Sequence, residues 1–217
     1  MRERVDGNVR LIFQPAEEGV NGGGARVMVE EAALEGVDEI YAFHNWPGFP
    51  HGSARVSAGP VMASVHDLVI ELRGVGGHAS QPQVTRDPVV AGAALVTALQ
   101  SVVSRNISAT DAAVLSVCTF HAGEANNVIP ARARLTGTLR TFDTSVAANV
   151  VDRIRAVCSG IAESYGVEIL PEIQALYPVL VNHADCAEAV RQAAEAILGP
   201  TAVSPAGLPL AAAEDFG

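Results

Sequence analysis

The feature that most constrains this chain is an apolar run that ends at a proline and is followed at once by two acids. Leu11, Ile12 and Phe13 lead through Gln-Pro-Ala to Glu17 and Glu18. We expect a strand that delivers both acids to its carboxyl end, which is where open α/β sheets build their sites. Adjacent side chains point in different directions, so the two acids suit different roles. The alternative is a solvated Glu pair that opens a surface helix.

The next segments predict a βαβ unit. A strand over residues 9–13, glycines at 22–24, a helix over 25–34 and a second strand over 39–43 follow one another. The second strand ends at His44, before a Pro-Gly turn. A right-handed crossover would place the acids and His44 at one edge of a parallel sheet. The glycines lack the spacing of a phosphate-binding loop.

The middle of the chain predicts a separate unit with the order β-α-β-β-α-β. Polar and apolar residues alternate over 65–73, and Asp87-Pro88 is a good start for a helix that runs to about 103. The remaining predicted elements are strands over 113–119 and 132–141, a helix over 144–165 that ends at Gly166, and a strand over 167–176. This order is the ferredoxin-like arrangement, an antiparallel sheet with two helices on one face.

The predicted elements divide the chain into two domains. We expect the ferredoxin-like unit to span residues 63–178 and to be inserted into a discontinuous domain of residues 1–62 and 179–217. A helix predicted over 185–198 would pack back on the first part of the discontinuous domain.

Composition narrows the classes of partner. The formal net charge is -10 and Lys and Arg do not cluster, which argues against nucleic acid and anionic membranes and leaves small molecules or peptides. No apolar run approaches the roughly 18 residues of a membrane span, and the charged first residues do not resemble a secretory signal, so a cytoplasmic location is expected. Cys118, Cys158 and Cys186 form no CxxC pair and are interpreted as buried apolar residues.

Several motifs in order resemble the M20 family of metallopeptidases and amidohydrolases. They are QPAEEG, FHNWPG, GGHAS, NNVIPARA with GTLRTF, and AAEDFG. They are similar to the branch of N-acyl-amino-acid amidohydrolases and hippurate hydrolases. The resemblance implies part of an α/β catalytic domain with an inserted ferredoxin-like lid and dimerisation domain. It also implies hydrolysis of the amide bond of small N-acyl amino acids or peptide-like substrates.

The resemblance implies a metal site in the discontinuous domain. Glu17 would be the general base that deprotonates the attacking water, and Glu18 and His44 would be metal ligands. A complete site would hold two divalent ions, and imidazole and carboxylate ligands suit Zn, Mn or Co. The acids Glu214 and Asp215 of AAEDFG are not assigned as ligands.

The resemblance also implies functional residues in the inserted domain. His78 would reach across a homodimer and stabilise the oxyanion in the partner's site, which is a large catalytic effect. Asn127 and Arg140 would hold the substrate's carboxylate, a task that suits the guanidinium fork. The alternatives are a surface histidine, a turn asparagine and an ordinary strand arginine.

The chain also departs from the family pattern. The family has a His/Cys-Gly-His-Asp segment before QPAEEG and a late histidine, and neither is present in these residues. We therefore expect an internal fragment that is incomplete and inactive as it stands. Aminopeptidase or carbamoylase activity is the alternative within the family, and a non-catalytic dimerising binding protein is the alternative outside it.

Overall fold

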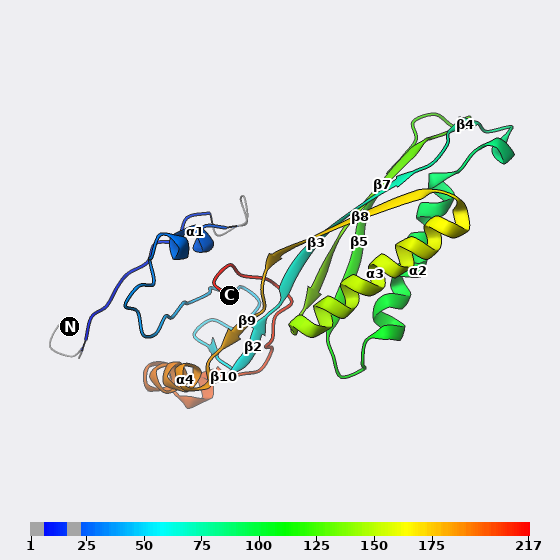
Figure 1. The fold of residues 1–217 in the computed structure, drawn as a ribbon. Helices are drawn as coiled ribbons and strands as arrows, with labels where there is room; N and C mark the ends of the chain where they lie inside the picture. The colour runs from blue at the N-terminus through cyan, green and yellow to red at the C-terminus, as the bar shows by residue number, and fades with distance from the viewer. Residues whose placement is uncertain (1–6, 17–22) are drawn as a thin grey trace.

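A computed structural model describes residues 7–16 and 23–217 as a mixed α/β structure (Figure 1). The helices in this part are α1 (Ala25–Glu30), α2 (Pro88–Asn106), α3 (Thr144–Tyr165) and α4 (Ala184–Leu198), with the 3-10 helices η3 (Pro82–Val84) and η4 (Pro200–Ala202). The strands are β1 (Ala54–Arg55), β2 (Gly59–Met62), β3 (Ser64–Arg73), β4 (Gly77–His78), β5 (Ala113–Ala122), β6 (Val128–Ile129), β7 (Arg132–Thr141), β8 (Glu168–Tyr177), β9 (Leu180–Asn182) and β10 (Val203–Ser204).

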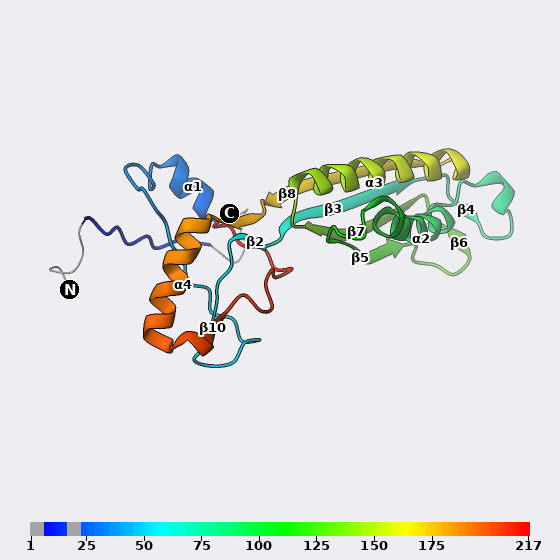
Figure 2. The ribbon, with the colours of Figure 1, turned by 90° about the horizontal axis from the view of Figure 1, so that it is seen from below.

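The largest sheet has the strand order β5-β7-β3-β8, and every pair in it is antiparallel. Helices α2 and α3 lie side by side along it (Figures 1 and 2). The chain order through this unit is β3-α2-β5-β7-α3-β8, with the short pair β4 and β6 at its far end. The elements predicted over residues 65–176 are therefore present, with ends that move by three residues or fewer.

One apolar core lies between the sheet and the two helices. The alternation predicted for 65–73 is confirmed, because Leu68, Ile70 and Leu72 are buried while Asp67 and Arg73 are exposed. The same apolar core also contains Ala133, Leu135 and Leu139 of β7, Ala91, Leu95, Leu99 and Val102 of α2, and Val150, Ile154 and Cys158 of α3. Burial of this apolar surface is the main source of stability for the unit.

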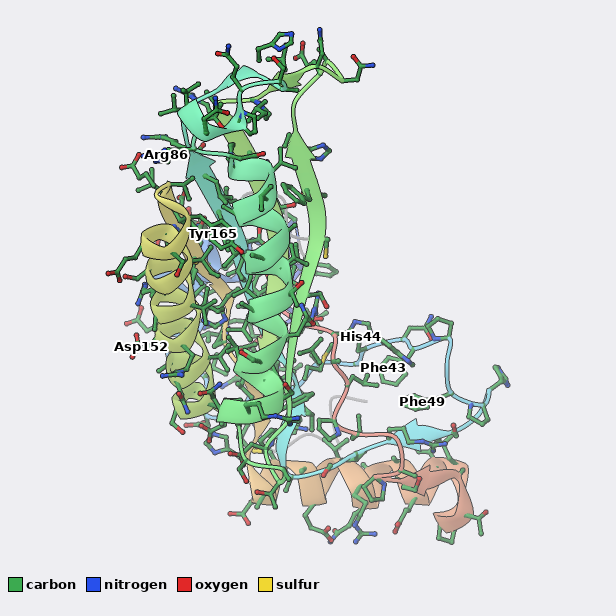
Figure 3. The ribbon with its side chains drawn as sticks, turned by 90° about the vertical axis from the view of Figure 1, so that its right-hand side faces the viewer. Phe43, His44, Phe49, Arg86, Asp152 and Tyr165 are labelled. Carbon is green, nitrogen blue, oxygen red and sulfur yellow. The ribbon has the colours of Figure 1, made fainter. Side chains whose placement is uncertain are left out.

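The ends of α2 and α3 are set by local chemistry. The Asp87 carboxylate accepts hydrogen bonds from the backbone N–H groups of Val89 and Val90, and Asp143 does the same at Ser145 and Val146. Both acids are N-caps that satisfy N–H groups left unpaired by the helix. At its other end α3 stops at Gly166, whose φ of 65° is left-handed and suits glycine. Arg86 and Tyr165 lie near this end of α3 (Figure 3).

The cap at Asp143 predicts a pH dependence of stability. A hydrogen bond from the Ser145 hydroxyl, with those from Val146 and Ser145 N–H, lowers the pKa of Asp143 below its ordinary 3.8. A carboxylate whose pKa is lower in the folded state stabilises the fold above its unfolded pKa and loses this contribution as pH falls through the folded value. Asn caps helices as well as Asp does but does not titrate. Thermal unfolding followed by circular dichroism should therefore show a smaller acid-induced fall in Tm for Asp143→Asn than for wild type. Equal falls would contradict the role of the cap.

A second group of elements lies at the end of the four-stranded sheet where β3 begins and β8 ends. Strand β2 pairs antiparallel with β9, and β1 pairs in parallel with β10, beside α4. The C-terminal segment runs along the start of β3, because Ala63 N–H donates to the carbonyls of Leu210 and Ala212. At the same point the buried Ser64 hydroxyl contacts Thr141 Oγ1 at 2.9 Å. The C-terminal residues are thus fixed beside the junction of the two parts of the chain.

The predicted parallel βαβ unit is not formed in the described part of the chain. Residues 9–13 and 39–43 are not strands, and Phe13 and Phe43 are 84% and 88% exposed. A strand needs hydrogen-bonding neighbours, and neither stretch has them here. Instead, the Arg10 guanidinium donates to the carbonyls of Ala33 and Glu35. The helix predicted over 25–34 is shortened to α1 and a run of turns.

Two expectations from composition need correction. Helix α2 has 19 residues and a mean hydropathy of 1.3, so among the residues that the structure describes one helix has the length and composition of a membrane span. Its buried residues belong to the core of the four-stranded unit, which accounts for this composition. The three cysteines are free, but only Cys158 is buried, and burial raises the pKa of its thiol to about 11. Cys118 is exposed on β5, an edge strand, and Cys186 is half-buried.

Candidate metal and catalytic site

His44 is held in an orientation that suits a metal ligand. Its Nδ1 lies 3.0 Å from the carbonyl oxygen of Asn45, and its ring is tilted against Trp46 at a centroid distance of 5.6 Å. A carbonyl oxygen can only accept, so Nδ1 carries the proton and Nε2 keeps a lone pair in the neutral ring. This backbone hydrogen bond is the usual way in which the tautomer of a ligating histidine is fixed.

The C-terminal segment brings an acid to His44. The Nε2 atom lies 3.5 Å from Oε2 of Glu214, whose side chain is 11% exposed. Figure 3 shows His44 on the segment that runs beside the C-terminal residues. An imidazole nitrogen and a carboxylate facing one another form an ion pair when the ring is protonated, or two ligands of the kind that Zn, Mn and Co accept.

The neighbouring acid, Asp215, joins three parts of the chain. Its Oδ1 accepts a hydrogen bond from the Gln14 side chain, and its Oδ2 accepts one from Ala25 N–H at 3.2 Å. The residue is buried, with 9% of its surface exposed. Glu214 thus contacts His44, and Asp215 contacts the first residue of QPAEEG and the start of α1.

The predicted base Glu17 and the predicted ligand Glu18 lie outside the described residues. Both fall in the sequence between Gln14 and Gly23, whose positions are described. Within residues 7–16 and 23–217, no group of three or more His, Cys, Asp or Glu side chains is placed to hold a metal ion. The donors that are present, an imidazole and a carboxylate, fit a divalent ion in kind.

Arg140 lies at the same end of the molecule as His44. It sits on β7 opposite Val65, and its Nη1 donates to the carbonyl of Ala211 at 2.8 Å. Ala211 is three residues before Glu214 in the chain. The guanidinium predicted to bind a carboxylate is therefore anchored to the segment that also contacts His44.

His78 and Asn127 lie together at the opposite end of the sheet. Strands β4 and β6 pair His78 with Val128, and the Asn127 carbonyl accepts from Ala79 N–H at 3.0 Å. Ser80 N–H donates to Nδ1 of His78 at 3.2 Å, and the Ser80 hydroxyl lies 2.7 Å from the same atom. A backbone N–H can only donate, so Nδ1 accepts and the proton of the neutral ring is on Nε2. His78 thus has a donor at Nε2, the opposite tautomer to His44.

The structure therefore separates the predicted site residues into two groups. Arg140 is at the Val65 end of β3, whereas β4 follows the Arg73 end (Figure 1). A ten-residue strand at about 3.3 Å per residue spans about 30 Å. His78 and Asn127 are thus about one sheet length away from His44 and Arg140 in the same chain.

Comparison with known proteins identifies the family. The model of peptidase family M20/M25/M40 matches residues 1–217. The chain belongs to this family. The resemblance of these motifs to M20 proteins is thereby confirmed.

Among the curated relatives, the N-acetylcysteine deacetylase of Bacillus subtilis is 44% identical over 167 residues, which are 77% of this chain and 43% of the relative. The hippurate hydrolase of Campylobacter jejuni is 36% identical over 218 residues, 99% of this chain and 56% of the relative. The chain thus spans about half the length of these two curated relatives.

A solved structure shows the same fold. A dinuclear metal-binding peptidase of the M20 family from Bacillus subtilis matches with a TM-score of 0.74 and 31% identity. The match covers 94% of this chain and 50% of that chain. The mixed α/β architecture agrees with this M20 neighbour.

Sequence reasoning noted AAEDFG but assigned its acids no role. Glu214 and Asp215 lie about 170 and 200 residues from the groups that they contact, so no local spacing could pair them. The signal that the sequence did contain was the acid pair next to a short apolar run. Such a position indicates that the acids could be buried, and buried acids almost always have partners.

Proposed function

We propose that the full-length gene product is a metal-dependent hydrolase that cleaves the amide bond of N-acyl amino acids. The observation that carries the proposal is that Nε2 of His44 faces the carboxylate of Glu214 at 3.5 Å, since an imidazole nitrogen and a carboxylate are donors that suit a divalent ion. His78, on a separate strand pair, would supply a hydrogen-bond donor to the oxyanion. The relatives named for N-acetylcysteine and hippurate act on compounds of this class.

Glu18 and His44 would hold a divalent ion, together with ligands that this stretch does not supply. A divalent ion, when bound, polarises the scissile carbonyl and lowers the pKa of water at the site. Glu17 takes the proton from the attacking water and passes it to the leaving amine. Two ions per complete site are proposed, in line with the dinuclear centre named for the Bacillus subtilis neighbour. Zn, Mn and Co all suit these donors.

Arg140 and Asn127 are proposed to bind the free carboxylate of the substrate's amino-acid part. Arg140 lies close to the His44 segment, which places a fixed positive charge near the proposed metals. A guanidinium can bind a carboxylate through two parallel hydrogen bonds. Asn127 lies at the distant end beside His78, so it would act with His78 rather than with Arg140 of the same chain.

We propose that residues 63–178 form the inserted ferredoxin-like lid and dimerisation domain, and that 1–62 with 179–217 form part of the catalytic domain. The two connect through Ala63 and through residues 178–179, next to β2 and β9. The separation of about 30 Å along β3 supports a homodimer in which His78 serves the partner's site. Edge strand β5 offers unpaired backbone groups for such an interface.

The proposed activity predicts a metal-dependent turnover of N-acyl amino acids. We expect full-length protein to release the amino acid from hippurate or N-acetylcysteine, to lose this activity in a chelator, and to regain it on addition of Zn, Mn or Co ions. Amine release measured by a ninhydrin-type assay reports each step. Matched substrates whose amino-acid carboxylate is esterified test the role assigned to Arg140, and we expect them to be poorer. Turnover that persists after verified metal removal would overturn the proposal.

A further inference from the structure

The backbone around His78 is fixed by hydrogen bonds and by close packing. Strand β4 pairs with β6, and Ala79 N–H donates to the carbonyl of Asn127 at 3.0 Å. Gln81 N–H donates to the carbonyl of His78 at 2.9 Å and closes a turn. A Cβ added to Gly76, just before β4, would lie 2.7 Å from a carbonyl oxygen of β6, which is closer than real Cβ atoms come. The backbone that carries His78 therefore has little freedom, and the orientation of the imidazole ring depends on its own contacts.

Ser80 makes the contacts that hold the ring. Its backbone N–H donates to Nδ1 of His78 at 3.2 Å, and its hydroxyl oxygen lies 2.7 Å from the same atom. Because Nδ1 accepts from the N–H, it carries no proton, and the hydroxyl can only donate to it. Among the residues that the structure describes, none makes a hydrogen bond to Nε2 of His78. The N–H group at Nε2 is therefore left for another molecule.

We propose that Ser80 is a positioning residue, whose hydroxyl holds the ring of His78 in the orientation and tautomer that present an N–H donor at Nε2. This inference rests on the function proposed above, because that function supplies the oxyanion that the donor would stabilise. The hydrogen bond made by one ring nitrogen sets which nitrogen carries the proton. A donor that is already oriented does not have to be reorganised during the reaction, which is why such donors stabilise developing charge strongly. Ser80 itself touches no reacting atom and acts through His78.

The kinetic test compares Ser80→Ala with Ser80→Thr in the full-length gene product, with hippurate or N-acetylcysteine as substrate. Alanine removes the hydroxyl and keeps the backbone N–H, whereas threonine keeps both donors. We expect Ser80→Ala to lower kcat about 3- to 10-fold, the effect of losing one hydrogen bond, with little change in KM. Ser80→Thr should stay close to wild type. Ser164→Ala is the matched control and should keep the wild-type kcat, because the Ser164 hydroxyl is exposed on α3 and donates to the carbonyl of Gly160.

A double-mutant cycle separates positioning from a general effect on the structure. If Ser80 acts through His78, then Ser80→Ala should lower kcat no further when His78 is already alanine. If the hydroxyl instead supports the fold around β4, its loss should lower kcat by the same factor in both backgrounds. Equal factors would therefore overturn the positioning role, and so would a wild-type kcat for Ser80→Ala.

Nitrogen NMR of the ring supplies a readout that does not depend on activity. In full-length protein with isotope-labelled histidine, at about pH 8.5 where imidazole is neutral, long-range proton–nitrogen correlations show which ring nitrogen carries the proton. The signals of His78 are those that His78→Ala removes. We expect the proton on Nε2 and an Nδ1 signal that moves in Ser80→Ala but not in Ser80→Thr.

The two readouts separate this inference from the proposed function. If the ring signals behave as expected but the full-length protein hydrolyses neither substrate, the proposed function fails, whereas the orientation of the ring by Ser80 is supported. A proton on Nδ1 in the wild type would overturn the inference whatever the activity. An Nδ1 signal that Ser80→Ala leaves in place would do the same.

Discussion

Replacing Glu17 by glutamine in the full-length protein is expected to lower kcat by about 10²- to 10⁴-fold, the usual contribution of a general base. Glutamine keeps the size and polarity of the side chain but cannot accept the proton of the attacking water. Because Glu17 is assigned as base and not as ligand, metal content measured by atomic emission should stay at the wild-type value. KM should change little, since the base acts in the transition state and not in substrate binding.

Two matched variants make this expectation specific. Glu18→Gln removes the proposed ligand one position further on, and we expect it to lose both metal and activity. Glu30→Gln removes an exposed carboxylate from the nearby helix α1, where it pairs with Arg26, and we expect wild-type activity. If Glu17→Gln instead loses metal while Glu18→Gln keeps it, the roles of the two acids are exchanged. If Glu17→Gln turns over substrate at the wild-type rate, Glu17 is not the general base.

The sequence predicted the four-stranded unit well because its signals are local. Asp87 and Asp143 cap their helices through N–H groups two and three residues away, and Gly166 ends α3 through its own backbone conformation. The alternation over 65–73 reflects burial against helices that are themselves part of the same unit. The helix ends and the buried face of β3 all depend on residues within the described part of the chain. The elements predicted from the sequence therefore agree with the structure.

The predicted strands over 9–13 and 39–43 failed for the complementary reason. A short apolar run indicates a segment that could be buried as a strand, but the pairing of that strand depends on neighbours that lie elsewhere. Val9, Leu11 and Phe13 are all more than 70% exposed, so nothing in the described residues covers this segment. The chain spans about half the length of its curated relatives. Local pattern alone therefore could not decide whether these stretches form strands.

The sequence predicted His44 as a metal ligand from its position after an apolar segment, and this role stays a prediction with which the hydrogen bond to Asn45 is compatible. The sequence did not predict which residues His44 contacts. The contacts of Glu214 with His44 and of Asp215 with Gln14 join residues at opposite ends of the sequence. Such pairs follow from the path of the chain around β2 and β3, which no motif encodes. The separation of His78 from Arg140 likewise became visible only with the register of β3 against β7.

That separation leads to the second large effect, which concerns His78. We expect His78→Ala in the full-length protein to lower kcat by about 10²- to 10³-fold, as loss of one oxyanion donor does. Metal content and dimer mass, measured by atomic emission and light scattering, should not change. His183→Ala is the matched control, because His183 is an exposed histidine at the start of α4 whose side chain makes no cap hydrogen bond and which has no assigned role. We expect that variant to keep wild-type activity.

Mixing the two inactive variants then tests which chain His78 serves. In a dimer of Glu17→Gln with His78→Ala, the site of the His78→Ala chain has its own Glu17 and receives His78 from the partner. The other site lacks both groups. Random exchange makes half of the dimers mixed, so activity should recover to about a quarter of wild type. If His78 instead acts within its own chain, neither chain of a mixed dimer has both groups. Mixtures that stay inactive after mass spectrometry has verified exchange would therefore exclude the shared site, despite the distance of about 30 Å along β3.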